Sequence, residues 1–100
     1  MQRLVEQPSG DGEIFEGALS LGSAHYHLSV YQHFSAAENE DVPANLEVEG
    51  HLRPHGLDVA ELHRRGSELT LRMSDGRALD FSFIDGHGRL RSTGRQLYQP

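Results

Sequence analysis

One stretch of the chain, Ala24–Phe34, constrains the fold most, because its residues alternate between two kinds. One set is mainly apolar and would lie on one side of an extended strand: Tyr26, Leu28, Val30 and Phe34. The other set carries most of the polar chemistry: His25, His27, Ser29, Tyr31 and His33. Successive Cβ atoms of a strand point to opposite faces. The pattern therefore predicts a half-buried strand with its core side and its histidine-bearing outer side both defined.

The composition is that of one small globular domain. The chain has 100 residues, of which 36% are hydrophobic and 24% charged, and it has no cysteine. Disulfides and thiolate metal sites are therefore excluded. Residues 1–12 contain Pro8, Gly10 and Gly12 with little periodicity, so we expect a flexible N-terminal lead-in there. Residues 13–100 are expected to form a single β domain.

Membrane and nucleic-acid partners are disfavoured by composition. No apolar run approaches the roughly 18 residues of a membrane span, and the first 12 residues are too polar for a signal peptide. We therefore expect a cytoplasmic protein. The formal net charge is −6, which makes nucleic acid unlikely as the partner.

A hairpin is predicted to join two strands at the start of the domain. The first would run over about Glu13–Leu21, with Phe15, Leu19 and Leu21 inward. Gly22-Ser23 stands between the two alternating runs and suits a two-residue turn. That turn would set Leu19 opposite Tyr26 and Phe15 opposite Val30.

A third strand is expected over about Asn45–Arg53, after an acidic loop at Ser35–Ala44. Its inward residues would be Leu46, Val48 and Leu52. Pairing with the second strand would place Glu49 beside Tyr31, His51 beside Ser29 and Arg53 beside His27. A slip of two residues would keep the faces and change these neighbours.

The segment Leu57–Gly66 carries a complete set of helix signals. Asp58 suits the N-cap and Glu61 closes a capping box, while Gly66 follows two arginines as a C-terminal stop. Leu57 can pack on Leu62 across the first turn. We expect a helix of about two turns that links strands.

Two further strands, Glu68–Met73 and Arg77–Ile84, flank Ser74-Asp75-Gly76. A three-residue loop with a left-handed Gly76 would pair Leu71 with Leu79 and match the faces. A last, less regular strand is expected at about Arg89–Tyr98, with a bulge near Gly94.

These elements predict an all-β, mainly antiparallel small barrel or sandwich with one short helix between the third and fourth strands. The element order over about residues 13–84 resembles that of the OB-fold, which has five strands and a helix between the third and fourth. A generic six-stranded antiparallel barrel or sandwich fits the sequence equally well.

The outer face of this sheet is the candidate binding surface. Its expected members are Ile14, Glu16, His25, His27, Tyr31, Glu49 and His51. Such a face suits a protein partner or a homodimer, with a strength that changes as imidazoles protonate between about pH 5 and 7. We therefore expect a non-catalytic binding, accessory or regulatory module rather than an enzyme, because no nucleophile elbow or phosphate-binding glycine loop is present.

A metal site and an OB-like single-stranded nucleic-acid binder are the alternatives. His25 and His27 would lie about 6.6 Å apart at a rise of about 3.3 Å per residue, so with His51 they could bind zinc or another transition metal. His33 would lie too far along the strand to join them. Nucleic-acid binding would use a basic stripe across the last three strands, formed by Arg72, Arg77, Arg89, Arg91 and Arg95. Phe81 and Phe83, however, are expected inward and cannot stack on bases. No cofactor is expected outside the metal alternative.

Overall fold

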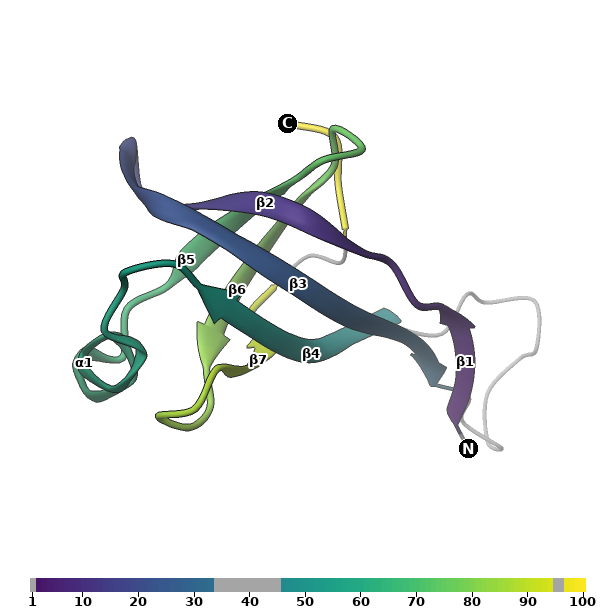
Figure 1. Cartoon of the computed structure of the whole chain (residues 1–100). Coiled ribbons are helices and arrows are strands. Elements are labelled where there is room, and N and C mark those ends of the chain that lie inside the picture. The colour runs from purple at the N-terminus through teal and green to yellow at the C-terminus, as the bar shows by residue number, and fades with distance from the viewer. Residues whose placement is uncertain (1, 34–45, 95–96) are drawn as a thin grey trace.

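The computed structural model describes residues 2–33, 46–94 and 97–100, which form seven strands and one helix (Figure 1). In chain order these are β1 (Gln2–Glu6), β2 (Ser9–Glu16), β3 (Leu19–His33), β4 (Leu46–Pro54), α1 (Val59–Arg65), β5 (Leu69–Met73), β6 (Ala78–Phe83) and β7 (Arg89–Ser92). The acidic loop expected at Ser35–Ala44, together with Phe34, lies outside the described residues.

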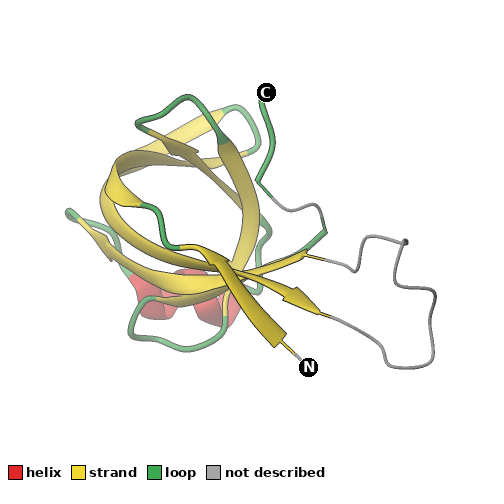
Figure 2. Cartoon of the chain, turned by 90° about the vertical axis from the view of Figure 1, so that its right-hand side faces the viewer, coloured by secondary structure: helices red, strands yellow, loops and turns green. Residues whose placement is uncertain are grey.

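Six of the strands close into a barrel. The order runs β3-β2-β5-β6-β7-β4, and β4 pairs again with β3, every pairing being antiparallel. Figure 2 looks into this ring of strands. The small all-β barrel expected from the sequence is therefore confirmed. It differs from an OB-fold, which has five strands and is partly open, because β7 lies between β6 and β4 and completes the ring.

The barrel interior holds the apolar sets of the alternating strands. Tyr26, Leu28 and Val30 of β3 are buried, as the period of two predicts. From the other strands, Val48, Leu52, Leu71, Phe81 and Leu90 join the same core cluster. The hydroxyl of Tyr26 is 3.1 Å from that of Ser74, so its polar atom is satisfied where the ring reaches the edge of the core.

The helix follows its sequence signals closely. The Glu61 N–H donates to Asp58 Oδ1 over 3.1 Å, and Gly66 adopts a left-handed φ of 66° at the C-terminal end. Leu62 is buried, while Leu57 and Val59 pack partly buried against the core. The expected position, between the strands at 46–54 and 69–73, is confirmed.

The second hairpin also forms as expected. Leu71 pairs with Leu79 and Leu69 with Phe81, and Gly76 has a φ of 92° in the loop. The last strand is shorter than expected: β7 ends at Ser92. Beyond β7, Tyr98 forms an isolated antiparallel β-bridge with Ala78.

The turn expected at Gly22-Ser23 is wrong. The chain turns at Gly17-Ala18, so that Glu16 pairs with Leu19, and both Gly22 and Ser23 lie inside β3. Gly17 has a φ of 62°, a conformation that glycine adopts at little steric cost and that such tight turns use. Two glycines five residues apart were both able to form the turn, and the pattern favoured the wrong one.

This shift, with a bulge between Ile14 and Phe15, reverses the expected faces of β2. Ile14 is fully buried, although it was expected on the binding face, and Phe15 is only partly buried. The guanidinium of Arg72 lies 5.2 Å from the centre of the Phe15 ring. Leu19, also expected inward, is 63% exposed. A bulge inserts one residue and so changes which side chains point inward beyond it.

The register of β3 and β4 is slipped by two residues from the expected pairing. His27 pairs with His51, Ser29 with Glu49 and Tyr31 with Glu47. The faces are kept, as they must be for a slip of two. This register needs a glycine at position 50, because a Cβ there would come within 2.3 Å of the His27 carbonyl oxygen.

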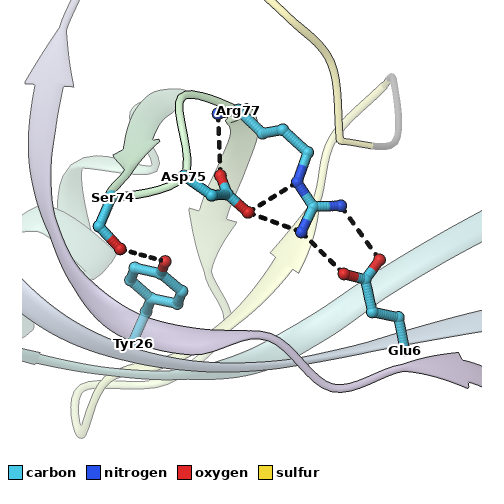
Figure 3. A network of polar contacts seen from close by, with 5 residues as sticks. All are labelled: Glu6, Tyr26, Ser74, Asp75 and Arg77. Atoms are coloured by element: carbon cyan, nitrogen blue, oxygen red, sulfur yellow. Dashed lines mark hydrogen bonds and ion pairs between the residues drawn. The ribbon is translucent and has the colours of Figure 1, made fainter.

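Residues 2–12, which were expected to be a flexible lead-in, contain β1 and the first part of β2. Arg3 pairs with Gln32 and Leu4 with Tyr31 on the long strand β3. A polar network then fixes the end of β1 (Figure 3). Arg77 donates to both carboxylate oxygens of Glu6 over 3.0 and 2.7 Å.

The same arginine donates from Nε to Asp75 Oδ2 over 2.9 Å, and its backbone N–H donates to the other oxygen. These bonds lower the pKa of Glu6 and of Asp75 and raise that of Arg77. The network therefore ties the first strand to the β5–β6 loop.

Candidate functional site

A groove of about 320 Å³ crosses the outer side of β3, β4 and β7. It is lined by His27, Ser29, Tyr31, Glu49, Gly50, His51, Arg89 and Leu90. The side chains come from two parts of the chain that are far apart in sequence. The groove therefore depends on the pairing of β4 with β7, which brings Arg89 beside His51.

Across the groove, paired residues form rows that run from strand to strand. One row is His27, His51 and Arg89, each the direct partner of the next, and we refer to it as the basic ladder. Side chains of directly paired residues lie about 4.5–5.5 Å apart at Cβ. Three side chains that can carry positive charge therefore stand side by side.

The next row contains the acidic member of the groove. Ser29 pairs with Glu49, which in turn pairs with Arg91. Arg91 Nε also lies 3.3 Å from a carboxylate oxygen of Glu47. Within the part of the chain that the structure describes, Arg89 has no ion pair of its own. The two arginines of β7 thus differ, since Arg91 is engaged and Arg89 is not.

The turn before β7 holds the basic ladder in position. The Asp85 carboxylate accepts from the backbone N–H of His87 over 2.8 Å and of Arg89 over 3.1 Å. These bonds lower the pKa of Asp85. His51 Nε2 is 3.1 Å from the His87 carbonyl oxygen, which fixes the ring of the central ladder residue against the turn.

Four of the seven residues expected on the binding face line the groove: His27, Tyr31, Glu49 and His51. His25 lies one row away on the same side of β3. Its Nδ1 is 3.1 Å from Asp11 Oδ1, and its ring meets that of His27 edge-on at 5.0 Å between centroids. It borders the groove without lining it.

The other two expected members belong elsewhere. Ile14 is in the core because of the bulge described above. Glu16 accepts two hydrogen bonds from Arg65 over 2.8 and 2.7 Å, so it ties the end of β2 to α1. Hydrogen bonds from Ser67 and Arg65 lower the pKa of Glu16.

The structure does not bring His25, His27 and His51 together as a metal centre. Within residues 2–33, 46–94 and 97–100, no three His, Cys, Asp or Glu side chains are grouped in a way that could hold a metal ion. His25 faces Asp11 while His51 faces the His87 carbonyl, so the imidazoles point to separate partners.

Sequence analysis missed two contributors to this surface. Arg89 joins the histidines only through the β4–β7 pairing, for which no local pattern exists. Leu4, 46% exposed, pairs with Tyr31 and so extends the surface with an aliphatic side chain, because directly paired residues share a face. Its strand had been assigned to the lead-in.

The arginines expected to form a basic stripe are separated. Arg77 is bound by Glu6 and Asp75, Arg91 lies against Glu47, and Arg72 lies over Phe15. Arg95, the remaining arginine of the expected stripe, lies outside the described residues. Among the described members of this set, Arg89 in the groove has neither an ion pair nor a ring contact, although its charge attracts the Asp85 carboxylate.

Comparison with protein-family models, with curated proteins and with solved structures gave no match. Among the residues that the structure describes, no helix is long and apolar enough to cross a membrane.

Proposed function

We propose that this protein is a non-catalytic binding module and that the groove on β3, β4 and β7 is its contact surface for a protein partner or a second copy of itself. The observation that carries the proposal is the coincidence of this groove with the histidine- and tyrosine-bearing side of β3. The groove lining includes Tyr31 and Arg89, and tyrosine and arginine are residue types enriched in contact regions between proteins.

The surface offers both apolar and polar contacts. Leu4 and the ring of Tyr31 are paired neighbours at one end, and the basic ladder lies at the other end, beyond Ser29 and Glu49. Gly50, which no larger residue can replace without a clash, keeps β3 and β4 close beneath it. The barrel provides a rigid support, since the backs of these strands are packed into the core.

Replacement of Tyr31 by glutamate tests the proposal. Tyr31→Glu should weaken self-association or partner binding at least about tenfold, because it replaces the aromatic contact of the groove with a charge. The matched control is Leu19→Glu, which changes an exposed apolar residue at the tip of the β2–β3 hairpin. Sedimentation of the three proteins over a range of concentrations measures the homodimer form.

A partner form is measured by pull-down with the same three proteins. Wild type and Leu19→Glu should capture the same partner, while Tyr31→Glu should not. Equal losses in both variants would contradict the assignment of the contact surface. Monomers at every concentration, together with equal capture by all three proteins, would reject the proposal.

A further inference from the structure

We propose that the groove selects acidic protein segments, with the basic ladder of His27, His51 and Arg89 as the subsite for their carboxylates. This inference rests on the proposed function and names the chemistry of the partner. The binding geometry would be that of a carboxylate above the basic ladder, with the guanidinium of Arg89 as its principal donor.

The first support is the arrangement of the ladder itself. Like charges directly opposite each other across a sheet are unfavourable, yet three side chains capable of positive charge are direct neighbours here. Protonation of the two imidazoles beside Arg89 is opposed by this repulsion, and a bound carboxylate offsets it and so favours the protonated imidazoles. Because imidazole ordinarily titrates near pH 6.5, the affinity should increase as the pH falls below 7.

The second support is that most acidic groups around the ladder interact with partners of their own. The titratable and charged groups that flank the ladder are Asp11, His25, Glu47, Glu49, Arg53, Asp85, His87 and Arg91. Asp11 is paired with His25 and Glu47 with Arg91. Asp85 accepts from the backbone N–H groups of His87 and Arg89 and also attracts the charge of the Arg89 side chain. Only Glu49 lines the groove as an acid.

With neutral histidines, the charges of Glu49 and Arg89 in the groove cancel, whereas the whole chain has a net charge of −6. Each protonated imidazole of the ladder adds one positive charge to the groove. The groove therefore gains charge complementarity toward an acidic segment as these imidazoles protonate.

Part of the ladder is also held in place before any ligand arrives. The His87 carbonyl fixes the ring of His51, while the bond to Asp85 reaches only the backbone of Arg89. A side chain that is already oriented, as His51 is, loses less conformational freedom on binding.

A blocked hexaglutamate peptide is a direct probe, and a blocked hexaglutamine peptide is its uncharged control. Calorimetric titration should show that hexaglutamate binds and hexaglutamine does not. Arg89→Gln should weaken the binding about tenfold, as expected for loss of a hydrogen bond between charged groups. Glu49→Gln should strengthen it about two- to fivefold, because a repulsive carboxylate is removed.

Arg72→Gln is the matched control, since Arg72 is an outward arginine of β5 on another side of the barrel. It removes the same formal charge and should leave the affinity unchanged within about twofold. For the wild type, affinity for hexaglutamate should rise severalfold from pH 7.5 to 5.5, and His27→Gln should reduce this increase. Circular dichroism checks that each variant is folded.

Equal losses in Arg89→Gln and Arg72→Gln would overturn the inference, because only net charge would then matter. Equal binding of hexaglutamine would also overturn it, as would tighter binding of oligothymidylate than of hexaglutamate at the same residues. If hexaglutamate fails to bind while Tyr31→Glu alone still loses association, the proposed function stands and this inference falls. If hexaglutamate binds through Arg89 while Tyr31→Glu keeps its association, this inference stands and the proposed contact through Tyr31 falls.

Discussion

The two sides of the barrel treat their polar side chains differently. On the outer side of β5 and β6, Asp80 Oδ1 accepts hydrogen bonds from Thr70 over 2.9 Å and from Tyr98 over 2.8 Å. Nearby, Arg72 lies over the ring of Phe15. On the groove side, Arg89 has no ion pair to the described residues, and two histidines stand next to it. The first side uses its polar groups to hold strands together, while the second leaves them available.

This difference separates stability from binding. A polar group that is already hydrogen-bonded contributes to folding and is costly to remove. An unpaired surface charge contributes little to folding and is free to interact with a ligand. We therefore expect substitutions on the two sides to have different consequences, and we expect inward substitutions on either side to have the largest effects on stability.

The largest effect is expected inside the barrel on β5. Leu71→Ala should lower the free energy of unfolding by about 2–5 kcal/mol, because it leaves a cavity in a fully buried position. Its outward neighbour provides the control: Arg72→Gln should cost no more than about 1 kcal/mol, the range of an exposed cation–π contact. Urea denaturation measures both. Similar losses would mean that the two faces of β5 are not distinguished as the burial indicates.

An intermediate effect is expected at Asp80. Asp80→Ala leaves two hydroxyl donors without their acceptor and should cost about 1–3 kcal/mol. Asp80→Asn retains an acceptor oxygen and should cost less. On the groove side, Arg89→Gln should change the stability by no more than about 0.5 kcal/mol. If Arg89→Gln destabilises the fold as much as Asp80→Ala does, the contrast between the two sides is wrong.

A smaller effect than that of Asp80→Ala is expected at Arg77, an arginine that is paired. Arg77→Gln should lower stability at pH 7 by about 1 kcal/mol or less, since its ion pairs with Glu6 and Asp75 are partly exposed. Both carboxyl pKa values are lowered in the folded state. The contribution is therefore fully present above about pH 5 and is lost as the pH falls through the lowered values.

Thermal unfolding of wild type and Arg77→Gln between pH 7 and pH 2 tests this dependence. The two melting curves should differ at pH 7 and converge in acid. Arg53→Gln serves as control because it removes an exposed arginine that has no ion pair to the described residues. A difference between wild type and Arg77→Gln that persists at pH 2 would assign the effect to packing of the side chain instead.

The parts of the fold that sequence predicted are those set by local rules. Asp58, Glu61 and Gly66 defined the helix because a cap needs only residues a few positions apart. The loop at 74–76 was correct because a three-residue connection alone matched the faces of its strands.

The sequence predictions were wrong where two turn positions were both possible, or where the structure depended on pairing with a strand distant in the sequence. Gly17 and Gly22 were both able to turn the chain, and the bulge after Ile14 had no sequence signal. The strand β1 is formed by antiparallel pairing with β3, which extends far enough to reach it. Its own residues gave little indication of this pairing.

The same distinction between local and long-range information applies to the residues of the candidate site. The alternation in β3 placed His27 and Tyr31 correctly on the outside, and the faces of β4 placed Glu49 and His51 with them. The alignment of these residues across the strands depended on the register, which was two residues off. Arg89 reaches the site only through a pairing between strands about forty residues apart.

That pairing has a consequence for how the protein folds. β2, β3 and β4 pair in chain order, as do β5, β6 and β7, so each set can form by local contacts that are entropically inexpensive. The β4–β7 contact is one of two seams that join the sets, and the groove lies across it. The groove is therefore assembled only when this seam has closed. A ligand in it would bind the finished barrel and not either half, and so would slow the opening of the seam and extend the lifetime of the native state.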